Sequence, residues 1–429
     1  MNPSDPSRRR FLLGAGGSAV AAAGGALAWS QLVTDRVGRR AAPAPATTTS
    51  SAPAPTGAGS RLVVVQLGGG NDALNSLPPA DGRYVDRRPT LAVAEADRVP
   101  LAGTTTHALH PSLAPLAPWW AAGSLAAVVP VAIEGQSRSH FQALDTWWSA
   151  RPGEHASTGW LGRWLDATAD TDPDNPLRAV ALGGGSPALV GTRSTVTVVN
   201  DPERFRLLTP PGADAEAITA ALLASAAPLG DEPLLAAARA ALPVTFEAAD
   251  QVGQAVGATD VDPASGPLGS LLRTAAGLID LDLGTRVVHV SAGGFDTHAG
   301  QADSHPRLLA DLADGLTALL AAVEDQGRAD EVVVLVLSEF GRRVAENGSG
   351  TDHGFGGLAL LAGTPVAGGR VVGQVDLGSL DGGDLAPDVD ARSLYAACLD
   401  HLGGVGGPDD AQLTDEVLDG PYDRLDLLV

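Results

Sequence analysis

The sequence contains no lysine and only one cysteine among its 429 residues. Arginine is therefore the only basic residue besides histidine. Together with the abundant alanine and glycine, this indicates codon bias of a GC-rich genome and not a functional signature. A single thiol excludes an internal disulfide bond. Cys398 lies in an apolar segment with a helical pattern, so we expect it to be a small core residue.

Positive charge is also scarce. The chain has 28 Lys-plus-Arg residues against 50 acidic ones, a formal net charge of −22. The first 60 residues hold six arginines against Asp5 and Asp35, so the remainder is more acidic still. Bulk charge of this sign argues against nucleic acid as a partner and against binding to an anionic membrane surface.

The N-terminus matches a twin-arginine export signal. Ser7–Leu13 (SRRRFLL) precedes a weakly hydrophobic Gly/Ala-rich stretch, which predicts a signal peptide over residues 1–28 with cleavage near Ala26–Ala28. Ala44–Ala46 is a second candidate for cleavage, and an uncleaved anchor is the alternative. We expect the twin-arginine translocase as a transient partner and no stable membrane span in the mature protein. Its destination would be the periplasm, the cell wall or the extracellular space.

Residues 29–60 read as a disordered linker rich in Pro, Ala, Thr and Ser, followed by one large domain over 61–429. Within that domain, about 167–283 combines two short apolar runs with several Ala-rich helical patterns. We expect this interval to contain a helical cap inserted between sheet strands, where substrate selection often resides. A helix is predicted over 389–402, with surface structure after it.

Four uninterrupted apolar runs predict strands that are covered on both faces, as in a parallel sheet. An amphipathic helix over 303–325 would cross from the third run to the fourth. The expected fold is α/β, a three-layer sandwich with a mostly parallel central sheet. The predicted strands are Arg61–Leu67, Leu125–Ile133, Arg286–Ala292 and Glu331–Leu337.

Acidic and histidine motifs directly follow these strands. Asp296 and His298 come after a glycine pair at the end of the third run, and a carboxylate and an imidazole two residues apart in an extended loop can point the same way. That pairing suits Zn²⁺ or Mn²⁺, with Ca²⁺ or Mg²⁺ as alternatives. The competing interpretation is an Asp–His hydrogen bond that caps the next helix.

Three further motifs lie at strand ends or in a loop close by. Asp72 follows a glycine triplet after the first strand, and Glu339 follows the fourth strand. Asp352 and His353 lie in a polar, Gly-rich loop downstream. Because ligands bind outside the carboxyl ends of parallel strands, these groups predict a site for one or two divalent metal ions. Glu339 taken alone fits an arginine partner equally well.

The second strand leads into Ser137, Arg138, Ser139 and His140, just before a helical pattern. A hydroxyl at a helix N-terminus is well placed for nucleophilic attack, and an arginine there can hold an anion. For either serine, an ordinary N-cap is the alternative.

Together these motifs resemble the DUF1501 family of exported bacterial proteins, over Arg61 to Leu402. The motifs that carry the resemblance are GGGNDALN, QSRSHF, GGFDTH, SEFGR and TDHG. That family is grouped with the alkaline phosphatase/sulfatase superfamily, whose members hydrolyse or transfer phosphate and sulfate esters at a one- or two-metal site. The resemblance therefore implies an alkaline phosphatase-like fold and a small-molecule or polymer ester as substrate.

Position by position, the resemblance supplies one ion with Asp296, His298 and His353. A second ion would keep Asp72 and Glu339, with Asp352 or Asn71 in addition. The superfamily nucleophile falls near Gln136–Ser139. Two departures stand out: the spacing is Asp-x-His where phosphatases typically show Asp-x₃-His, and Phe340 occupies the position of a histidine ligand.

Two other functions remain open. A metal- or oxyanion-binding exported protein without turnover would use the same residues. A nicotinamide-dependent oxidoreductase would use Gly68-x-Gly70-x-x-Ala73 as a loose dinucleotide fingerprint. Against the second, Asp72 would face the pyrophosphate, and no acidic residue clearly ends a second strand about 20 residues on.

Overall fold

The computed structural model describes residues 59–153, 155–169, 175–226, 233–258, 266–403 and 410–429. The predicted signal peptide and almost all of the predicted linker lie outside these residues. The described chain divides into a large unit, which includes residues up to 206 and from 248 onwards, and a small unit of residues 207–247.

In the described residues, the large unit is built on a nine-stranded sheet. Eight strands follow the order β10-β4-β9-β8-β1-β7-β5-β6, and β13 pairs with β4. Their bounds are β1 (Arg61–Leu67), β4 (Leu125–Ala132), β5 (Ala179–Leu182), β6 (Thr197–Val199), β7 (Val287–Ala292), β8 (Val332–Leu337), β9 (Gly357–Ala362), β10 (Arg370–Val372) and β13 (Val389–Asp390).

The sheet is mostly parallel, as predicted. β1 pairs in parallel with both β7 and β8, whereas β9 pairs antiparallel with β4 and β8. The reversal of β9 matters for the site, because it brings the beginning of β9 to the edge at which the parallel strands end. The four predicted strands match β1, β4, β7 and β8 to within one residue at each end.

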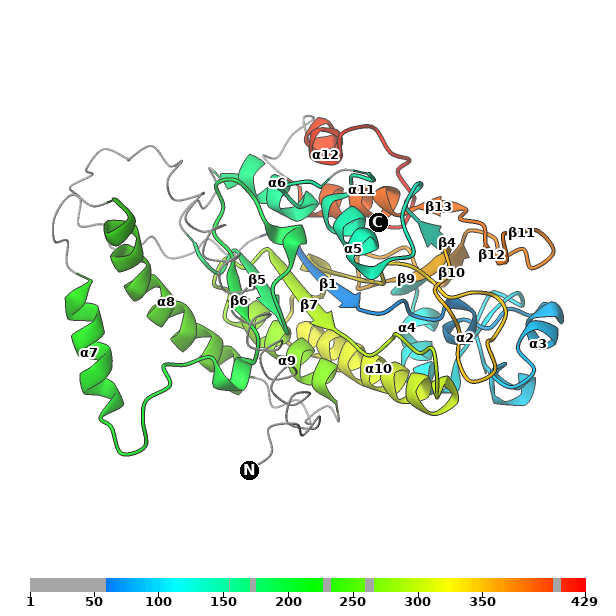
Figure 1. Cartoon of the computed structure of the whole chain (residues 1–429), viewed down its shortest axis with the longest axis horizontal. Coiled ribbons are helices and arrows are strands. Elements are labelled where there is room, and N and C mark those ends of the chain that lie inside the picture. Colours follow the sequence, from blue (N-terminus) through cyan, green and yellow to red (C-terminus); the bar gives the residue numbers. More distant parts are fainter. Residues whose placement is uncertain (1–58, 154, 170–174, 227–232, 259–265, 404–409) are drawn as a thin grey trace, which may run out of the picture. The chain divides into compact units, whose positions relative to one another are not determined.

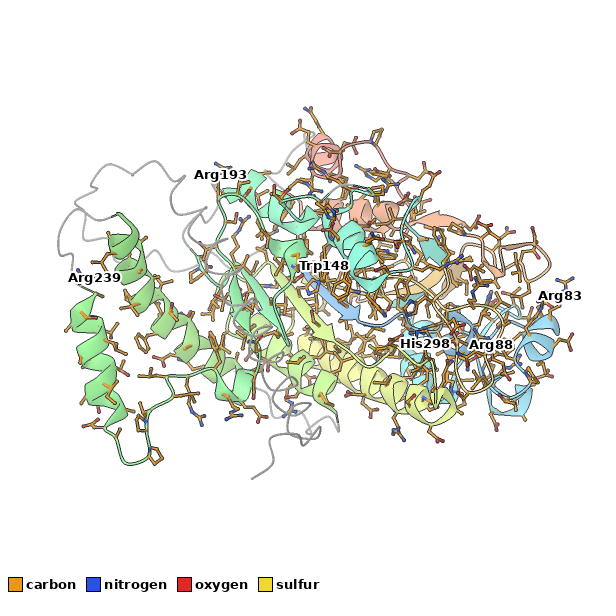
Figure 2. The ribbon with its side chains drawn as sticks, in the orientation of Figure 1. Arg83, Arg88, Trp148, Arg193, Arg239 and His298 are labelled. Atoms are coloured by element: carbon orange, nitrogen blue, oxygen red, sulfur yellow. The ribbon has the colours of Figure 1, made fainter. Side chains whose placement is uncertain are left out.

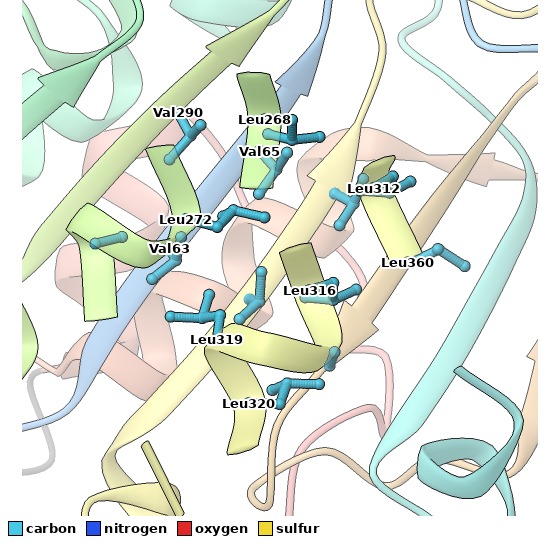
Figure 3. Packing of buried hydrophobic residues seen from close by; sticks show 14 of the residues in the cluster. Val63, Val65, Leu268, Leu272, Val290, Leu312, Leu316, Leu319, Leu320 and Leu360 are labelled. Atoms are coloured by element: carbon cyan, nitrogen blue, oxygen red, sulfur yellow. The ribbon is translucent and has the colours of Figure 1, made fainter. Parts of the chain in front are cut away.

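Alternate residues of β1 contribute to two hydrophobic cores, as the period of a strand requires. Val63 and Val65 belong to one core with helices α9 (Pro267–Asp280) and α10 (Gln301–Asp325). Figure 3 shows Leu268 and Leu272 of α9 and Leu312 and Leu316 of α10 packed against these valines. The long helix α10 connects β7 to β8, which is the predicted crossover.

Leu62 and Val64 belong to the second core, on the other face of β1. Helices α5 (His140–Ser149), α6 (Trp160–Ala167) and α11 (Ala391–Leu402) cover this face, opposite α9 and α10 (Figure 1). Cys398 is buried in this core, as expected. Helices on both faces of a mostly parallel sheet make an α/β fold of three layers.

The tail departs from its prediction as surface structure. Residues Asp410–Leu418 form helix α12, and Val417, Leu418 and Leu427 are buried in the second core. The apolar positions of this tail are too few and too widely spaced to give a clear helical period, so the burial depends on tertiary packing.

The interval predicted to hold a helical cap is divided in the structure. Its two apolar runs contain the sheet strands β5 and β6, and α9 packs in the first core. The small unit contains α7 (Ala215–Ser225), none of whose residues is buried, and the first part of α8 (Pro233–Gly257). No helix in the described ranges has the length and apolar character needed to cross a membrane.

Candidate metal centre

The loops at one edge of the sheet bring four candidate residues together. His140 begins α5 shortly after β4, and Asp296 and His298 follow β7. His353 precedes β9, whose antiparallel direction places it at the same edge. We call Asp296, His140, His298 and His353 the histidine cluster; Figure 2 labels His298 beside the beginning of α10.

Asp296 lies at the centre of the histidine cluster. Its Oδ1 is 3.0 Å from Nε2 of His353 and 3.1 Å from Nε2 of His298. Its Oδ2 is 3.5 Å from Nε2 of His140. Among the residues that the structure describes, His140, Asp296 and His353 offer ligand atoms that all lie within 4.8 Å of one another. His298 adjoins these three through Asp296 and His353.

Each imidazole of the cluster has its Nδ1 directed at an oxygen that can only accept a hydrogen bond. For His140 the partner is Oε1 of Glu339 at 2.9 Å, and for His298 it is Oδ1 of Asp352 at 3.1 Å. For His353 it is the backbone carbonyl of Arg138 at 2.8 Å. Nδ1 is therefore placed to carry a proton in all three rings, and in its neutral form each ring presents the lone pair of Nε2.

These lone pairs fit a cation. Nε2 of His298 and Nε2 of His353 are 2.9 Å apart, and both face the carboxylate of Asp296. Three lone pairs and a carboxylate at such distances repel one another unless a positive charge lies among them. Metal-bound histidines typically donate their other ring N–H to a carboxylate or a carbonyl, which is the arrangement of all three rings here.

Arg342 keeps Asp296 ionised and in place. Burial alone would raise the pKa of Asp296, but the hydrogen bond and the positive charge of Arg342 are the main effects that outweigh it and lower the pKa to about 2. The Arg342 guanidinium is buried and donates from Nη2 to Oδ1 of Asp296 at 2.7 Å. The carboxylate is therefore charged over the whole neutral range.

The same guanidinium joins the loops that carry the cluster. It donates to the backbone carbonyl of Gly70 after β1 at 2.7 Å, to that of Phe295 after β7 at 3.0 Å, and to that of Thr351 before β9 at 2.8 Å. In the structure its partners are these loops, so it acts as a structural clamp.

Two glycines allow the loops to approach so closely. A Cβ on Gly69 would lie 2.2 Å from the backbone nitrogen of Asp296, and Gly69 has a φ of +121°. A Cβ on Gly350 would lie 2.2 Å from the carbonyl oxygen of Thr297. Neither position has space for a side chain, which explains the glycine-rich texture of both loops.

Phe340 forms an apolar wall of the cluster. The ring is fully buried, with its centroid 5.0 Å from the imidazole of His140 and 4.5 Å from that of His353. In the sequence this residue takes the place of a histidine ligand of the superfamily. In the structure His140 lies beside this ring, and its Nε2 faces Oδ2 of Asp296 at 3.5 Å.

Glu339 lies behind the cluster, not within it. Its side chain is buried, and Oε1 accepts hydrogen bonds from Nδ1 of His140 and from the backbone N–H of Gly69 at 2.8 Å. It therefore orients an imidazole. Asp352 has the same relation to His298 but is exposed, and it also accepts a hydrogen bond from Asn347 at 3.0 Å.

Asp72 is bound into a separate buried network. Oδ2 pairs with Arg88 at 2.6 Å and accepts a hydrogen bond from Gln301 at 2.5 Å, while Oδ1 caps helix α2 (Ala73–Ser76) at the N–H of Asn75. Because Arg88, Gln301 and Asn75 satisfy both oxygens, we leave Asp72 out of the proposed ligand set. Nothing in the sequence marked Arg88 or Gln301 as its partners.

Ser137, Arg138 and Ser139 lie in the loop before α5. Ser139 is the N-cap residue of α5 without a capping side-chain hydrogen bond, and Oγ of Ser137 accepts from the backbone N–H of Ser139 at 3.0 Å. The Arg138 guanidinium is partly exposed and forms an ion pair with the buried carboxylate of Asp384. The ordinary N-cap role expected as the alternative for Ser139 is thus not formed.

A cavity of about 450 Å³ lies elsewhere, beside the network of Asp72. Asn75, His110, Gln301 and His305 are among the residues that line it, and no member of the histidine cluster does. The cluster itself is partly exposed, since 43% of the His298 side chain and 45% of the Asp296 side chain are accessible to solvent.

Residues 95–424 match the family model described as "Protein of unknown function (DUF1501)". No protein with a curated description matches the chain.

Solved structures similar to the chain include three distant ones. A protein in the alkaline phosphatase superfamily from Vibrio parahaemolyticus is 10% identical, with 87% of this chain and 73% of that chain covered and a TM-score of 0.37. A sulfatase from Pseudoalteromonas sp. is 12% identical, with 87% of this chain and 74% of that chain covered and a TM-score of 0.36. A phosphonate monoester hydrolase from Silicibacter pomeroyi is 11% identical, with 85% of this chain and 78% of that chain covered and a TM-score of 0.34.

Proposed function

The chain belongs to the DUF1501 family, and we propose that it is an exported, metal-dependent hydrolase of phosphate or sulfate esters. One observation carries this proposal: three imidazole Nε2 atoms converge on the ionised carboxylate of Asp296 while their Nδ1 atoms are held by outward-lying acceptors. This arrangement is typical of metal-bound histidines, and it lies at the edge of the sheet where α/β proteins bind ligands, which supports the proposal.

Asp296, His140, His298 and His353 would hold one divalent ion. Three nitrogen donors and one carboxylate suit Zn²⁺ or Mn²⁺ better than Ca²⁺ or Mg²⁺, which prefer oxygen ligands. Such an ion supplies Lewis-acid stabilisation of the charge that develops on a phosphoryl or sulfuryl oxygen. We propose a single ion, because Glu339 orients His140 and Asp72 is satisfied by Arg88 and Gln301.

Arg138 is the residue proposed to hold the substrate anion. Its backbone carbonyl accepts the proton of His353 Nδ1, so the residue is fixed beside the cluster. Its partly exposed guanidinium is anchored on one side by Asp384 and retains N–H groups for an incoming oxyanion. Phosphate and sulfate esters have the geometry that arginine binds in this way.

Ser137 and Ser139 are the proposed nucleophiles, in a two-step reaction in which the serine oxygen displaces the alcohol and water then releases the acid. Both lie in the loop that also carries Arg138 and leads into His140. Among the described residues, no histidine or carboxylate hydrogen-bonds to either hydroxyl. Direct attack by water is therefore retained as the alternative route.

A panel of aryl phosphate mono- and diesters and aryl sulfates tests this proposal with metal-replete protein. We expect turnover of at least one class, lost when His353→Ala removes a ligand. His155→Ala is the matched control, because the His155 side chain is almost fully exposed and lies outside the cluster. Metal-replete protein that turns over no ester would contradict the hydrolase.

The lack of a base on either serine favours a second candidate, a metal- or oxyanion-binding protein without turnover. Binding of inorganic phosphate or sulfate to metal-replete protein, with no ester cleaved, would select it. The oxidoreductase is not favoured. The helix after the glycine triplet has four residues, and the carboxylate of Asp72 already caps it.

We further propose export through the twin-arginine translocase to the periplasm, the cell wall or the exterior. The support is the sequence Ser7–Leu13, which lies outside the described residues. A small-molecule or polymer ester is the proposed substrate.

A further inference from the structure

The cavity beside the Asp72 network contains two buried histidines that the proposed hydrolysis does not use. His110 precedes a 3₁₀ helix (Pro111–Leu116), and His305 lies in α10. The His305 side chain is almost completely buried and that of His110 more than nine-tenths buried. Their rings meet edge to face with centroids 6.2 Å apart, and both line the cavity of about 450 Å³.

The hydrogen bonds of His305 fix which of its nitrogens carries the proton. Nε2 is 2.9 Å from Oδ1 of Asn71, and the same oxygen accepts a hydrogen bond from the hydroxyl of Ser76 at 3.1 Å. Asn71 therefore presents its oxygen, so Nε2 of His305 must donate. The lone pair is then on Nδ1, which is buried and has no hydrogen-bond partner among the described residues.

His110 has the same tautomer, but its other nitrogen is the one already hydrogen-bonded. Its Nδ1 accepts the backbone N–H of Ser112 at 3.0 Å, so the ring proton is on Nε2. Burial lowers the pKa of His110, and it lowers the pKa of His305 to about 4. Both rings are therefore neutral at physiological pH, and the pair offers one N–H donor and one lone pair.

A hydroxyl group complements this pair. Its oxygen can accept the N–H of His110 while its hydrogen is donated to Nδ1 of His305. Asp97 is the one charged residue among the described residues that line the cavity, and no arginine is among them. An anionic ligand would therefore have no positive counter-charge there. The side-chain amides of Asn75 and Gln301 add further polar groups to the walls.

We propose that this cavity is a binding site for a small, uncharged, hydroxyl-bearing molecule, such as a polyol or a monosaccharide, recognised through His110 and His305. The site is separate from the histidine cluster and does not depend on the proposed hydrolysis. Gln301 links the two regions, because it lines the cavity and its Oε1 accepts the hydroxyl of Thr351, the residue before Asp352.

The test is titration of the metal-replete protein with glycerol, myo-inositol, D-glucose and D-galactose, followed by the ¹⁵N chemical shifts of the histidine rings. We expect at least one of these probes to shift Nδ1 of His305 in a saturable way. His305→Phe and His110→Phe should each weaken that binding at least about tenfold, since each removes one hydrogen bond to the ligand.

Three controls keep the outcome unambiguous. His155→Phe, at an almost fully exposed position, should bind the probe as the wild type does. His353→Ala should also leave probe binding unchanged, which separates this site from the metal centre. If His305→Phe fails to fold because it leaves Asn71 unpaired, His110→Phe carries the test alone.

Two results would overturn the proposal. One is the absence of a saturable shift with all four probes, which would mean that only water hydrogen-bonds to the polar atoms of the cavity. The other is binding that neither His110→Phe nor His305→Phe weakens. Preferential binding of D-glucose 6-phosphate over D-glucose at the same rings would also overturn it, because no positive side chain lines this cavity.

Discussion

Nε2 of His298 and Nε2 of His353 lie 2.9 Å apart, although the Nδ1 of each ring is directed at an oxygen acceptor. Two neutral imidazoles in these tautomers would meet lone pair to lone pair. The contact is explained if both nitrogens are ligands of the same cation. The proposed function depends on this relationship more than on any motif taken alone.

Glu339 is expected to be a positioning residue for the metal. Glu339→Gln keeps the shape of the side chain but removes the charge that holds the proton on Nδ1 of His140. Loss of such a partner typically weakens metal binding by about 10–100-fold. Competition with a chromophoric chelator measures the affinity, and Glu324→Gln, at an exposed position of α10, is the control. Equal affinity in Glu339→Gln and the wild type would remove this role.

Asp72 is expected to stabilise the fold and not to bind the metal. Asp72→Asn leaves the buried guanidinium of Arg88 without its counter-charge, which should lower the free energy of unfolding by about 3–5 kcal/mol. Metal content should be unchanged. Denaturant unfolding and elemental analysis of the same sample measure both. Loss of metal with unaltered stability would instead identify Asp72 as a ligand.

The same pair predicts how acid affects stability. Although burial would raise the pKa of Asp72, Arg88 and His305 lower it below the ordinary value of 3.8. The ionised Asp72 therefore contributes fully to the free energy of unfolding above about pH 4. This contribution is lost as the pH falls through the lowered pKa of Asp72 in the folded state. Unfolding of wild type and Asp72→Asn between about pH 6 and pH 2 should converge at the acid end. A constant difference between them would contradict the assignment.

The nucleophile is tested by the double variant Ser137→Ala, Ser139→Ala. If either hydroxyl attacks the ester, turnover should fall to the level of protein without metal, while bound metal stays at the wild-type level. The single variants then show which serine acts. Unchanged turnover in the double variant would mean that water attacks the ester directly.

Export is tested by replacing Arg8 and Arg9 with Lys. The translocase receptor is expected to read the guanidinium pair and not charge alone, so the variant should remain in the cytoplasm as the precursor. Fractionation and the mass of the product measure this. Export of the variant at the normal rate would contradict the signal proposed for residues 1–28.

The strands could be predicted closely because an uninterrupted run of Val and Leu allows few alternatives. β1 matches its prediction at both ends, and the crossover helix α10 starts two residues earlier than expected. By contrast, α8 is 25 residues long, and it continues through Pro243 beyond the Ala-rich part of its sequence. Proline usually breaks or kinks a helix, so a prediction from sequence ends the helix before Pro243.

The site could be predicted in part, because its residues follow strand ends that were identifiable. Asp296, His298, His353 and His140 were all named as candidates, and the structure brings them together. What the sequence could not do was distinguish a carboxylate that binds a cation from one that binds Arg88 or orients a histidine. That difference depends on partners more than ten residues away, which no local pattern contains.

Elemental analysis of mature protein purified without chelator tests the central claim most directly. We expect about one equivalent of a divalent transition metal per chain, and a loss of that metal in His353→Ala but not in His155→Ala. Wild-type protein with less than about 0.2 equivalents, even after folding in the presence of Zn²⁺ or Mn²⁺, would contradict the metal centre.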